Sequence, residues 1–202
     1  AALVCQSYHP KKLRTANVLD MPFLPITNFD VQYAVSNAIF SHPAVKKNFK
    51  QWNATIFAIN VLPQYEYMGK GKVPGSVADF KGMRLRALGG MGRSAKKIGA
   101  VPTTVPASET YNALARGTVD AIGFPFTYAF SAYKLDEVAE WYTTNMSLGT
   151  VNCPIVANID SWNALPGQYK KLLNSLKKPA VEYQSAAYAK KDLENLKVWP
   201  TK

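Results

Sequence analysis

The sequence predicts an α/β fold, on three observations. Apolar runs rich in β-branched residues alternate along the chain with segments of helical spacing, which is typical of α/β proteins with largely parallel sheets. Apolar residues make up 48% of the 202 residues and aromatic residues 12%, too much for a disordered chain. No stretch reaches the roughly 20 unbroken apolar residues of a membrane-spanning helix. The chain is therefore expected to fold around an apolar core and not to span a membrane.

The first third of the chain predicts two strands and two helices. Asn28 can cap a helix that carries Val35 and Ile39 on one face, and Pro43 suits the first turn of a second helix. A later run, 55–62, is apolar on both faces, as in a buried parallel strand. In order, the expected elements are a strand over 2–6, helices over 28–41 and 43–52, and a strand over 55–62.

The rest of the chain continues the alternation after a loop rich in glycine and lysine at 69–75. A helical pattern runs from about residue 160 to about residue 196, and Pro179 predicts a kink or break within it. The other expected elements are a helical turn over 76–80, strands over 83–87, 101–105, 118–123 and 151–157, and helices over 92–98, 108–116 and around Phe130 and Tyr133.

Charge and cysteine content narrow the function classes. The 24 Lys+Arg against 13 Asp+Glu give a net charge of +11, but the basic residues are spread in pairs rather than gathered in one stripe, which favours a solubilising surface over a nucleic-acid interface. Cys5 and Cys153 lie in short apolar runs. They are either buried thiols or, in an oxidising compartment, a disulfide. Without a His/Cys cluster, no metal site is expected.

Catalytic motifs are missing from the sequence. The only histidines are His9 and His42, and no nucleophile elbow, phosphate-binding loop or HExxH motif occurs. No catalytic residue and no cofactor is therefore predicted. A hydrolase or isomerase on an α/β scaffold is an alternative against which the lack of a nucleophile–base pair counts.

The strand over 83–87 carries the clearest chemical signal. Alternation places Met83, Leu85 and Ala87 on one face and Arg84 and Arg86 on the other. The strand ends at a Gly-Gly pair, and binding crevices of α/β sheets lie at the carboxyl ends of strands. The planar fork of an arginine suits a carboxylate, because it makes two parallel charge-assisted hydrogen bonds. Two surface arginines would give the same alternation.

Five blocks of sequence carry a family resemblance. Residues 79–86, Asp-Phe-Lys-Gly-Met-Arg-Leu-Arg, are similar to the signature D-x-K-G-x-K-x-R, and residues 108–120 are similar to S-E-x-Y-x-A-L-x-x-G-x-V-D. The remaining blocks are residues 19–24, 99–102 and 161–166. In this order the blocks resemble the substrate-binding proteins of TRAP (tripartite ATP-independent periplasmic) transporters, DctP type.

The resemblance implies a periplasmic receptor, not an enzyme, that binds a small organic monocarboxylate and delivers it to a TRAP membrane permease. It implies a two-lobed periplasmic-binding-protein-like fold with hinge strands and a long lobe-spanning helix. The first lobe is expected to be incomplete and the chain an internal fragment, because the family's first strand–helix–strand unit has no counterpart. The expected lobes are residues 1–62 with 150–185, and residues 63–149 with 186–202.

The resemblance also bears on three charged residues. Arg86 corresponds to the family's carboxylate-binding arginine, and Arg84 to a surface position usually filled by lysine. Glu66, with Tyr65 beside it, stands where some relatives carry a second arginine. A carboxylate there would accept a hydrogen bond from a hydroxyl or an ammonium and would repel a second carboxylate. The structural alternative for Glu66 is a loop carboxylate paired with a lysine.

Four further candidates complete the expected ligand site. Phe124 stands where sialic-acid-binding relatives use an asparagine, and it favours an apolar or aromatic wall unless it is a core residue. Gln6 and Tyr8 match a cleft-lining loop of the first lobe, and Met146 lies near another cleft position. The expected ligand is a monocarboxylate such as an aromatic or hydroxy acid. The alternative is a zwitterionic amino-acid-like or ectoine-like solute, with Glu66 binding its ammonium.

Overall fold

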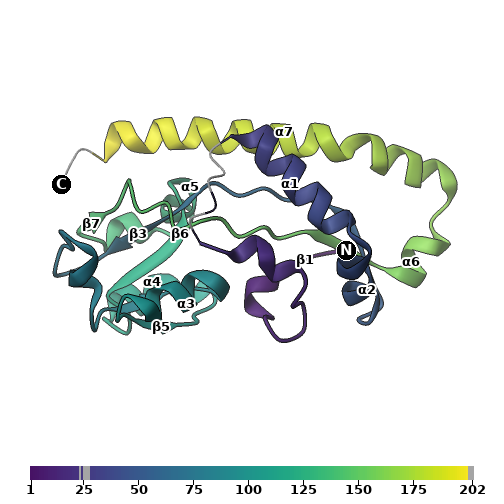
Figure 1. Ribbon diagram of the computed structural model, residues 1–202. Coiled ribbons are helices and arrows are strands. Elements are labelled where there is room, and N and C mark those ends of the chain that lie inside the picture. The colour runs from purple at the N-terminus through teal and green to yellow at the C-terminus, as the bar shows by residue number, and fades with distance from the viewer. Residues whose placement is uncertain (23, 25–27, 200–202) are drawn as a thin grey trace. The chain divides into compact units, whose positions relative to one another are not determined.

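The computed structural model describes residues 1–22, 24 and 28–199 (Figure 1). They divide into two compact units: unit 1 is Ala1–Asp20, Pro25–Leu62 and Val151–Ala187, and unit 2 is Met21–Leu24, Pro63–Thr150 and Tyr188–Lys202. The long helix α7 (Gly167–Val198) contributes residues to both units. Phe23, in the motif block over 19–24, lies outside the described residues.

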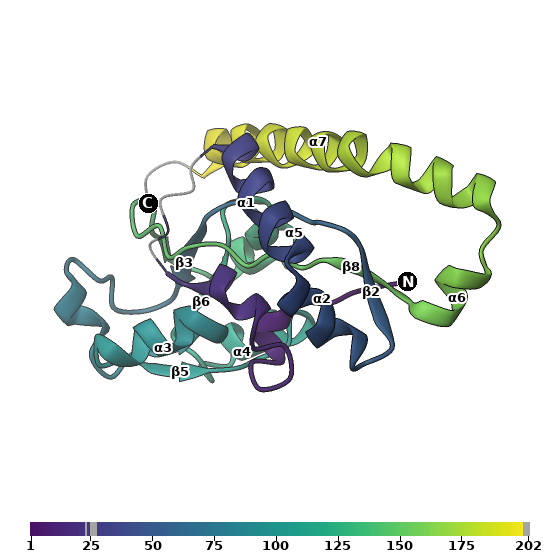
Figure 2. The ribbon, with the colours of Figure 1, turned by 45° about the vertical axis from the view of Figure 1, so that its right-hand side comes forward.

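Unit 1 is built on a three-stranded antiparallel sheet. The strand order is β1-β8-β2, and Figure 2 shows β2 beside β8. A buried cluster that includes Leu13, Phe40, Phe49, Val156 and Val181 joins the helices to this sheet. The elements are β1 (Ala2–Leu3), 3-10 helices at Gln6–Tyr8 and Ala16–Asp20, α1 (Phe29–Ser41), α2 (Pro43–Lys50), β2 (Ala54–Ala58), β8 (Ile155–Asn158), α6 (Ile159–Ala164) and the first part of α7.

The starts of α1 and α2 agree with the sequence prediction, whereas α2 ends at Lys50 rather than at residue 52. Asn28 Oδ1 accepts hydrogen bonds from the backbone N–H groups of Asp30 at 2.8 Å and Val31 at 3.2 Å, so the side chain caps the first turn of α1. His42 is extended between the helices, and Pro43 begins α2. A proline at this position costs nothing, because its missing N–H would have no partner within the helix.

Unit 2 is built on a five-stranded mixed sheet of order β5-β4-β6-β3-β7. β4 runs parallel to β5 and β6, whereas β3 runs antiparallel to β6 and β7. Every residue of β3 and β6 is buried. The elements are β3 (Tyr65–Gly69), β4 (Arg84–Arg86), α3 (Gly89–Lys97), β5 (Val101–Thr103), α4 (Thr110–Ala115), β6 (Ala121–Pro125), α5 (Tyr128–Ala132), β7 (Trp141–Tyr142) and 3-10 helices at Val77–Phe80, Ala107–Glu109 and Leu135–Glu137.

The prediction of largely parallel sheets is wrong, since one sheet is antiparallel and the other mixed. The strand expected over 55–62 is β2, which is shorter, antiparallel to β8 and mostly half-buried. Its apolar pattern has another cause: Ile56 packs on the core of unit 1, whereas the ring of Phe57 contacts that of Trp162. The pattern alone does not separate such a strand from a parallel one.

Several element boundaries differ from the prediction, and two strands were not predicted. The strand expected over 2–6 ends at Leu3, and the unpredicted strands are β3 and β7. The helical pattern after residue 160 breaks at Leu165 rather than at Pro179. Leu165 is extended because it precedes Pro166, and a residue before proline avoids the helical region. Among the described residues, no helix is long and apolar enough to cross a membrane.

Candidate functional site

Arg86 is a fully buried arginine at the carboxyl end of β4. Its side chain is 1% exposed. Its Nε donates to the carbonyl oxygen of Val105 at 3.1 Å, and its Nη1 donates to that of Gly123 at 2.8 Å. Both acceptors are neutral and belong to the backbone beside the strand. They fix the orientation of the guanidinium within unit 2.

Arg84 lies two residues earlier on the same strand and has a different environment. It is exposed and forms an ion pair with Asp120, whose Oδ2 also accepts from the backbone N–H of Arg84 at 2.7 Å. These hydrogen bonds hold the pKa of the Asp120 carboxyl below its usual value. The structure therefore separates the two arginines that the alternation of the strand grouped together.

Phe124 contacts the guanidinium of Arg86. It lies on β6, the strand next to β4, and is 4% exposed. The Cζ of Arg86 is 4.3 Å from the centroid of its ring, a geometry that attracts a cation to an aromatic face. The same ring stacks against Tyr133, with a centroid distance of 5.0 Å and an interplanar angle of 15°. Phe124 therefore links Arg86 to a wider aromatic cluster.

Glu66 lies on β3, directly opposite Phe124 in the sheet, and is 3% exposed. Its Oε2 accepts hydrogen bonds from the hydroxyl of Thr143 and from the N–H of Met146, the latter at 3.0 Å. Its Oε1 accepts from the N–H of Ser147 at 2.8 Å. The alternative of a loop carboxylate paired with a lysine is wrong, because Glu66 is a strand residue that binds a hydroxyl and two amides.

Tyr65 and Met146 belong to unit 2, as Glu66 and Arg86 do. Tyr65 is 4% exposed and lies opposite Pro125, at the end of β3. Met146 is half-buried and lines a cavity of about 400 Å³ with Tyr67, among other residues, but not with Arg86. The structure thus brings Arg86 into contact with Phe124, and Glu66 into a hydrogen bond with the backbone of Met146, while Glu66 and Phe124 are paired across the sheet.

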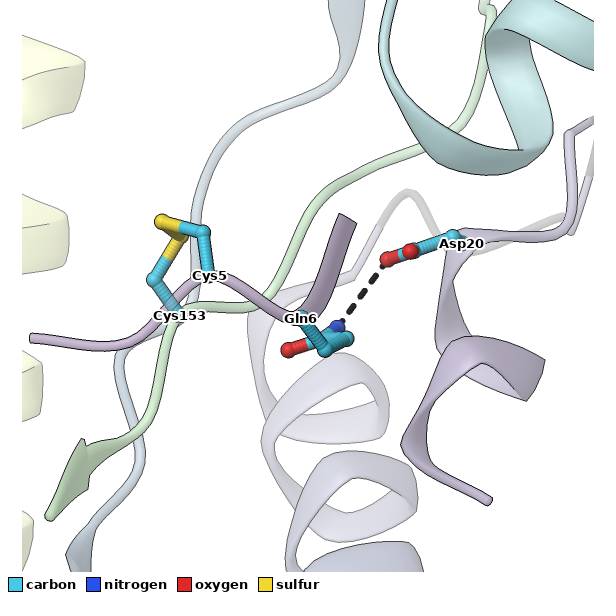
Figure 3. The surroundings of a disulfide bond; sticks show 4 residues. All are labelled: Cys5, Gln6, Asp20 and Cys153. Carbon is cyan, nitrogen blue, oxygen red and sulfur yellow. Dashed lines mark hydrogen bonds between the residues drawn. A yellow bond between two sulfur atoms is a disulfide. The ribbon is translucent and has the colours of Figure 1, made fainter. Parts of the chain in front are cut away.

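Gln6 and Tyr8 belong to unit 1, in the 3-10 helix that follows Cys5. Gln6 is buried, and its Nε2 donates to Asp20 Oδ1 at 3.0 Å (Figure 3). Cys5 forms a disulfide with Cys153, drawn beside Gln6 in Figure 3. Of the two alternatives for the cysteines, the structure has the disulfide, which joins the segment after β1 to the segment before β8.

Two asparagines of unit 1 were missed by sequence reasoning. Asn152 is fully buried, and neither polar atom of its side chain has a hydrogen-bond partner among the described residues; the same holds for Oδ1 of Asn60. Buried amides of this kind usually find partners. Each is a single asparagine in an apolar run, so the sequence held no signal for it. In the described part of the chain, no group of His, Cys, Asp and Glu could hold a metal ion.

Known proteins resemble this chain in sequence and in fold. A monocarboxylate 2-oxoacid-binding periplasmic protein of Nostoc sp. is 27% identical over 106 residues, which cover 50% of this chain and 28% of that protein. A TRAP periplasmic solute-binding protein of Desulfovibrio salexigens, solved with bound orotic acid, is 23% identical with a TM-score of 0.80, over 96% of this chain and 63% of that one.

A third relative is a marine metagenome TRAP solute-binding protein specific for aromatic acid ligands, from an unidentified microbe. It is 20% identical with a TM-score of 0.79, over 95% of this chain and 63% of the relative. The chain thus spans less than two thirds of the length of these relatives. The structural matches confirm the predicted α/β fold of the periplasmic binding proteins of TRAP transporters.

A family model also matches nearly the whole chain, over residues 2–199. Its description is bacterial extracellular solute-binding protein, family 7, and its name is DctP. The match confirms the resemblance that the five sequence blocks carry, and it is to a family of solute-binding proteins rather than enzymes. The chain belongs to the DctP family of bacterial extracellular solute-binding proteins.

Proposed function

We propose that the whole protein is a periplasmic receptor that binds a small organic monocarboxylate through Arg86 and delivers it to a TRAP membrane permease. The observation that carries the proposal is the buried, oriented guanidinium of Arg86 at the carboxyl end of β4. A guanidinium held in place loses little conformational entropy when it binds a carboxylate through parallel hydrogen bonds. In this proposal, units 1 and 2 are the two lobes of the receptor.

The ligand class follows from the surroundings of Arg86. Phe124 places an aromatic ring against the guanidinium, and Tyr133 stacks against that ring, so the wall beside Arg86 is aromatic. Such a wall suits a ligand with an aromatic or apolar body better than a densely hydroxylated one. The names of two relatives, the 2-oxoacid-binding protein and the protein specific for aromatic acid ligands, are in keeping with a monocarboxylate.

The role of Glu66 changes in this proposal. Three donors from residues 143, 146 and 147 already bind its two oxygens, and the side chain is buried. An ammonium group of a ligand would have to displace one of these donors. We therefore assign Glu66 to holding the segment that contains Met146, and a zwitterionic ligand is the less favoured alternative. Gln6 and Tyr8 remain proposed ligand contacts from unit 1.

The proposed location in the periplasm has two supports. The Cys5–Cys153 disulfide is of a kind that persists in oxidising compartments such as the bacterial periplasm. The family description calls its members extracellular solute-binding proteins, and the Nostoc relative is named a periplasmic protein. The permease as partner rests on the family alone.

The test is calorimetric titration of the full-length protein with a panel of monocarboxylates that includes benzoate and pyruvate. Arg86→Ala should weaken binding by more than about a hundredfold, because breaking a buried ion pair costs about 3–5 kcal/mol. Arg84→Ala, which loses a surface pair, is the matched control and should bind almost normally.

Arg86→Lys, checked for folding by circular dichroism, keeps the charge and removes the fork. It should still bind weakly, and it separates loss of binding from loss of structure. Equal losses for Arg84→Ala and Arg86→Ala, or a folded Arg86→Lys variant with unchanged affinity, would contradict the assignment.

A further inference from the structure

A groove runs along β2 at the open edge of the unit 1 sheet. It has a volume of about 390 Å³. α1 and α2 line one flank and α6 and α7 the other, with residues 54–59 between them. β2 is the last strand in the order β1-β8-β2, so in the described part of the chain its second edge pairs with no strand. In Figure 2, β8 follows one edge of β2 and continues into α6. We call this feature the β2 groove.

Side chains on the two faces of β2 pack against the walls of the β2 groove. Ala54 and Ile56 pack against the buried cluster that contains Phe40 and Phe49. On the other flank, the ring of Phe57 lies 5.4 Å from that of Trp162. The open edge of β2 is therefore held between two walls of side chains. An extended segment that enters would bury alternate side chains against each wall.

The β2 groove is positively charged on both flanks. Lys46 and Lys50 line it from α2, and Lys177 lines it from α7. The Nζ of Lys177 lies 5.0 Å from the centroid of the Phe57 ring, and desolvation lowers the pKa of this lysine. No aspartate or glutamate lines the groove, and within the described ranges none of the three lysines forms an ion pair.

We propose that the β2 groove binds an extended acidic segment of a partner protein, which adds to β2 as a further strand. Backbone N–H and C=O groups of the segment would pair with the open edge of β2, as in other complexes formed by strand addition. Its carboxylates would meet the lysines on the two flanks. Apolar or threonine side chains between them would cover Ile56 and Phe57.

The lysines favour an acidic segment over a second copy of this chain as the occupant of the β2 groove. Unpaired strand edges invite self-association, and natural proteins often place lysines there to oppose it. Two copies joined edge to edge through β2 would bring the lysines of α2 and α7 in one copy toward those of the other, and like charges repel. The same charges attract a strand that carries glutamate or aspartate. The β2 groove therefore selects its partner by charge and by backbone pairing.

The experiment measures fluorescence anisotropy of a labelled short peptide that alternates glutamate with valine or threonine, added to the whole protein. A matched peptide is N-methylated at alternate residues, which removes the backbone donors of one edge and keeps every charge. The first peptide should bind, and the N-methylated peptide should bind at least about tenfold more weakly. No binding of the first peptide, or equal binding of both, would overturn the proposal.

Two double variants localise the binding. Lys46→Glu with Lys50→Glu should weaken binding of the first peptide about tenfold or more, because both pairings become repulsive. Lys171→Glu with Lys190→Glu changes the net charge equally at exposed positions of α7 outside the groove, and it should have an effect below about twofold. If both double variants weakened peptide binding equally, the peptide would be attracted by the net charge of the protein alone.

Sedimentation tests self-association: a dimer that the peptide dissociates would assign the groove to a second copy of this chain. Either result would contradict the proposal.

Discussion

The two sheets of this protein bury their strands to different extents. In unit 2, all residues of β3 and β6 are buried, and these strands lie inside a sheet of five. In unit 1, β2 is an edge strand with four of its five residues half-buried. The unit with the enclosed sheet also holds the buried arginine, whereas the unit with the open edge is cross-linked by the disulfide. The units therefore differ in how their sheets are held: that of unit 2 encloses its inner strands, whereas unit 1 has an open sheet edge and a covalent cross-link.

The largest effect is expected from removing that link. The disulfide joins residues separated by 148 positions, and closing a loop of this length restricts the unfolded chain by about 3–5 kcal/mol. Cys5→Ser with Cys153→Ser should lower the free energy of unfolding by about that amount. Hydrogen exchange followed by mass spectrometry should show faster exchange in β1, β2 and β8. Loss of protection in β3 and β6 to the same degree would contradict the contrast between the units.

Packing in unit 2 is tested at Gly69, the last residue of β3. A Cβ added there would lie 2.3 Å from Cζ2 of Trp141, a ring that is buried on β7. Gly69→Ala should therefore destabilise the protein by about 1–3 kcal/mol in urea unfolding, the usual cost of overpacking. Gly75→Ala is the matched control, since its Cβ would meet nothing closer than 3.9 Å. Equal stability of the two variants would show that the sheet of unit 2 yields easily.

A third change tests the polar contact between β3 and the segment at 143–147. Glu66→Gln replaces one acceptor oxygen with an NH₂ group that faces donors, which costs about 1–3 kcal/mol in a buried site. The amides of Met146 and Ser147 should exchange faster in the variant. Glu109→Gln, at an exposed position, should change neither the stability of the protein nor the exchange of these two amides. Unchanged exchange at 146 and 147, with loss of ligand affinity, would restore Glu66 as a ligand contact.

Sequence reasoning succeeded where the signal was local. The caps at Asn28 and Pro43 mark helix ends, because the side chain or ring acts within one turn of its own residue. Alternation singled out the strand of Arg84 and Arg86, and the family motif singled out Arg86 of the two. The pattern did not reveal that Arg86 is buried, since that depends on Val105 and Gly123, which are distant in sequence.

The missed features depend on contacts between distant segments. β3 carries a glutamate between two tyrosines, and the donors that allow its burial come from residues 143–147. The pairing of β2 with β8 decides that β2 is antiparallel, and an apolar run does not encode its partner. Likewise, no sequence pattern predicts that the polar side chain of Asn152 is buried.

The smallest effect is expected at the ion pair of Arg84 and Asp120, which is partly exposed to solvent. Hydrogen bonds from Arg84 hold the pKa of Asp120 below its unfolded value of about 3.9. The pair therefore contributes stability above that pH, and the contribution is lost as the pH falls through the folded pKa. Asp120→Asn should lower stability slightly at neutral pH and flatten the loss on acidification. Amide hydrogen exchange measured at different pH values should show this change in stability in β4 and β6 and not in β2, because the ion pair belongs to unit 2 alone. An equal change in both sheets would mean that the two units unfold as one.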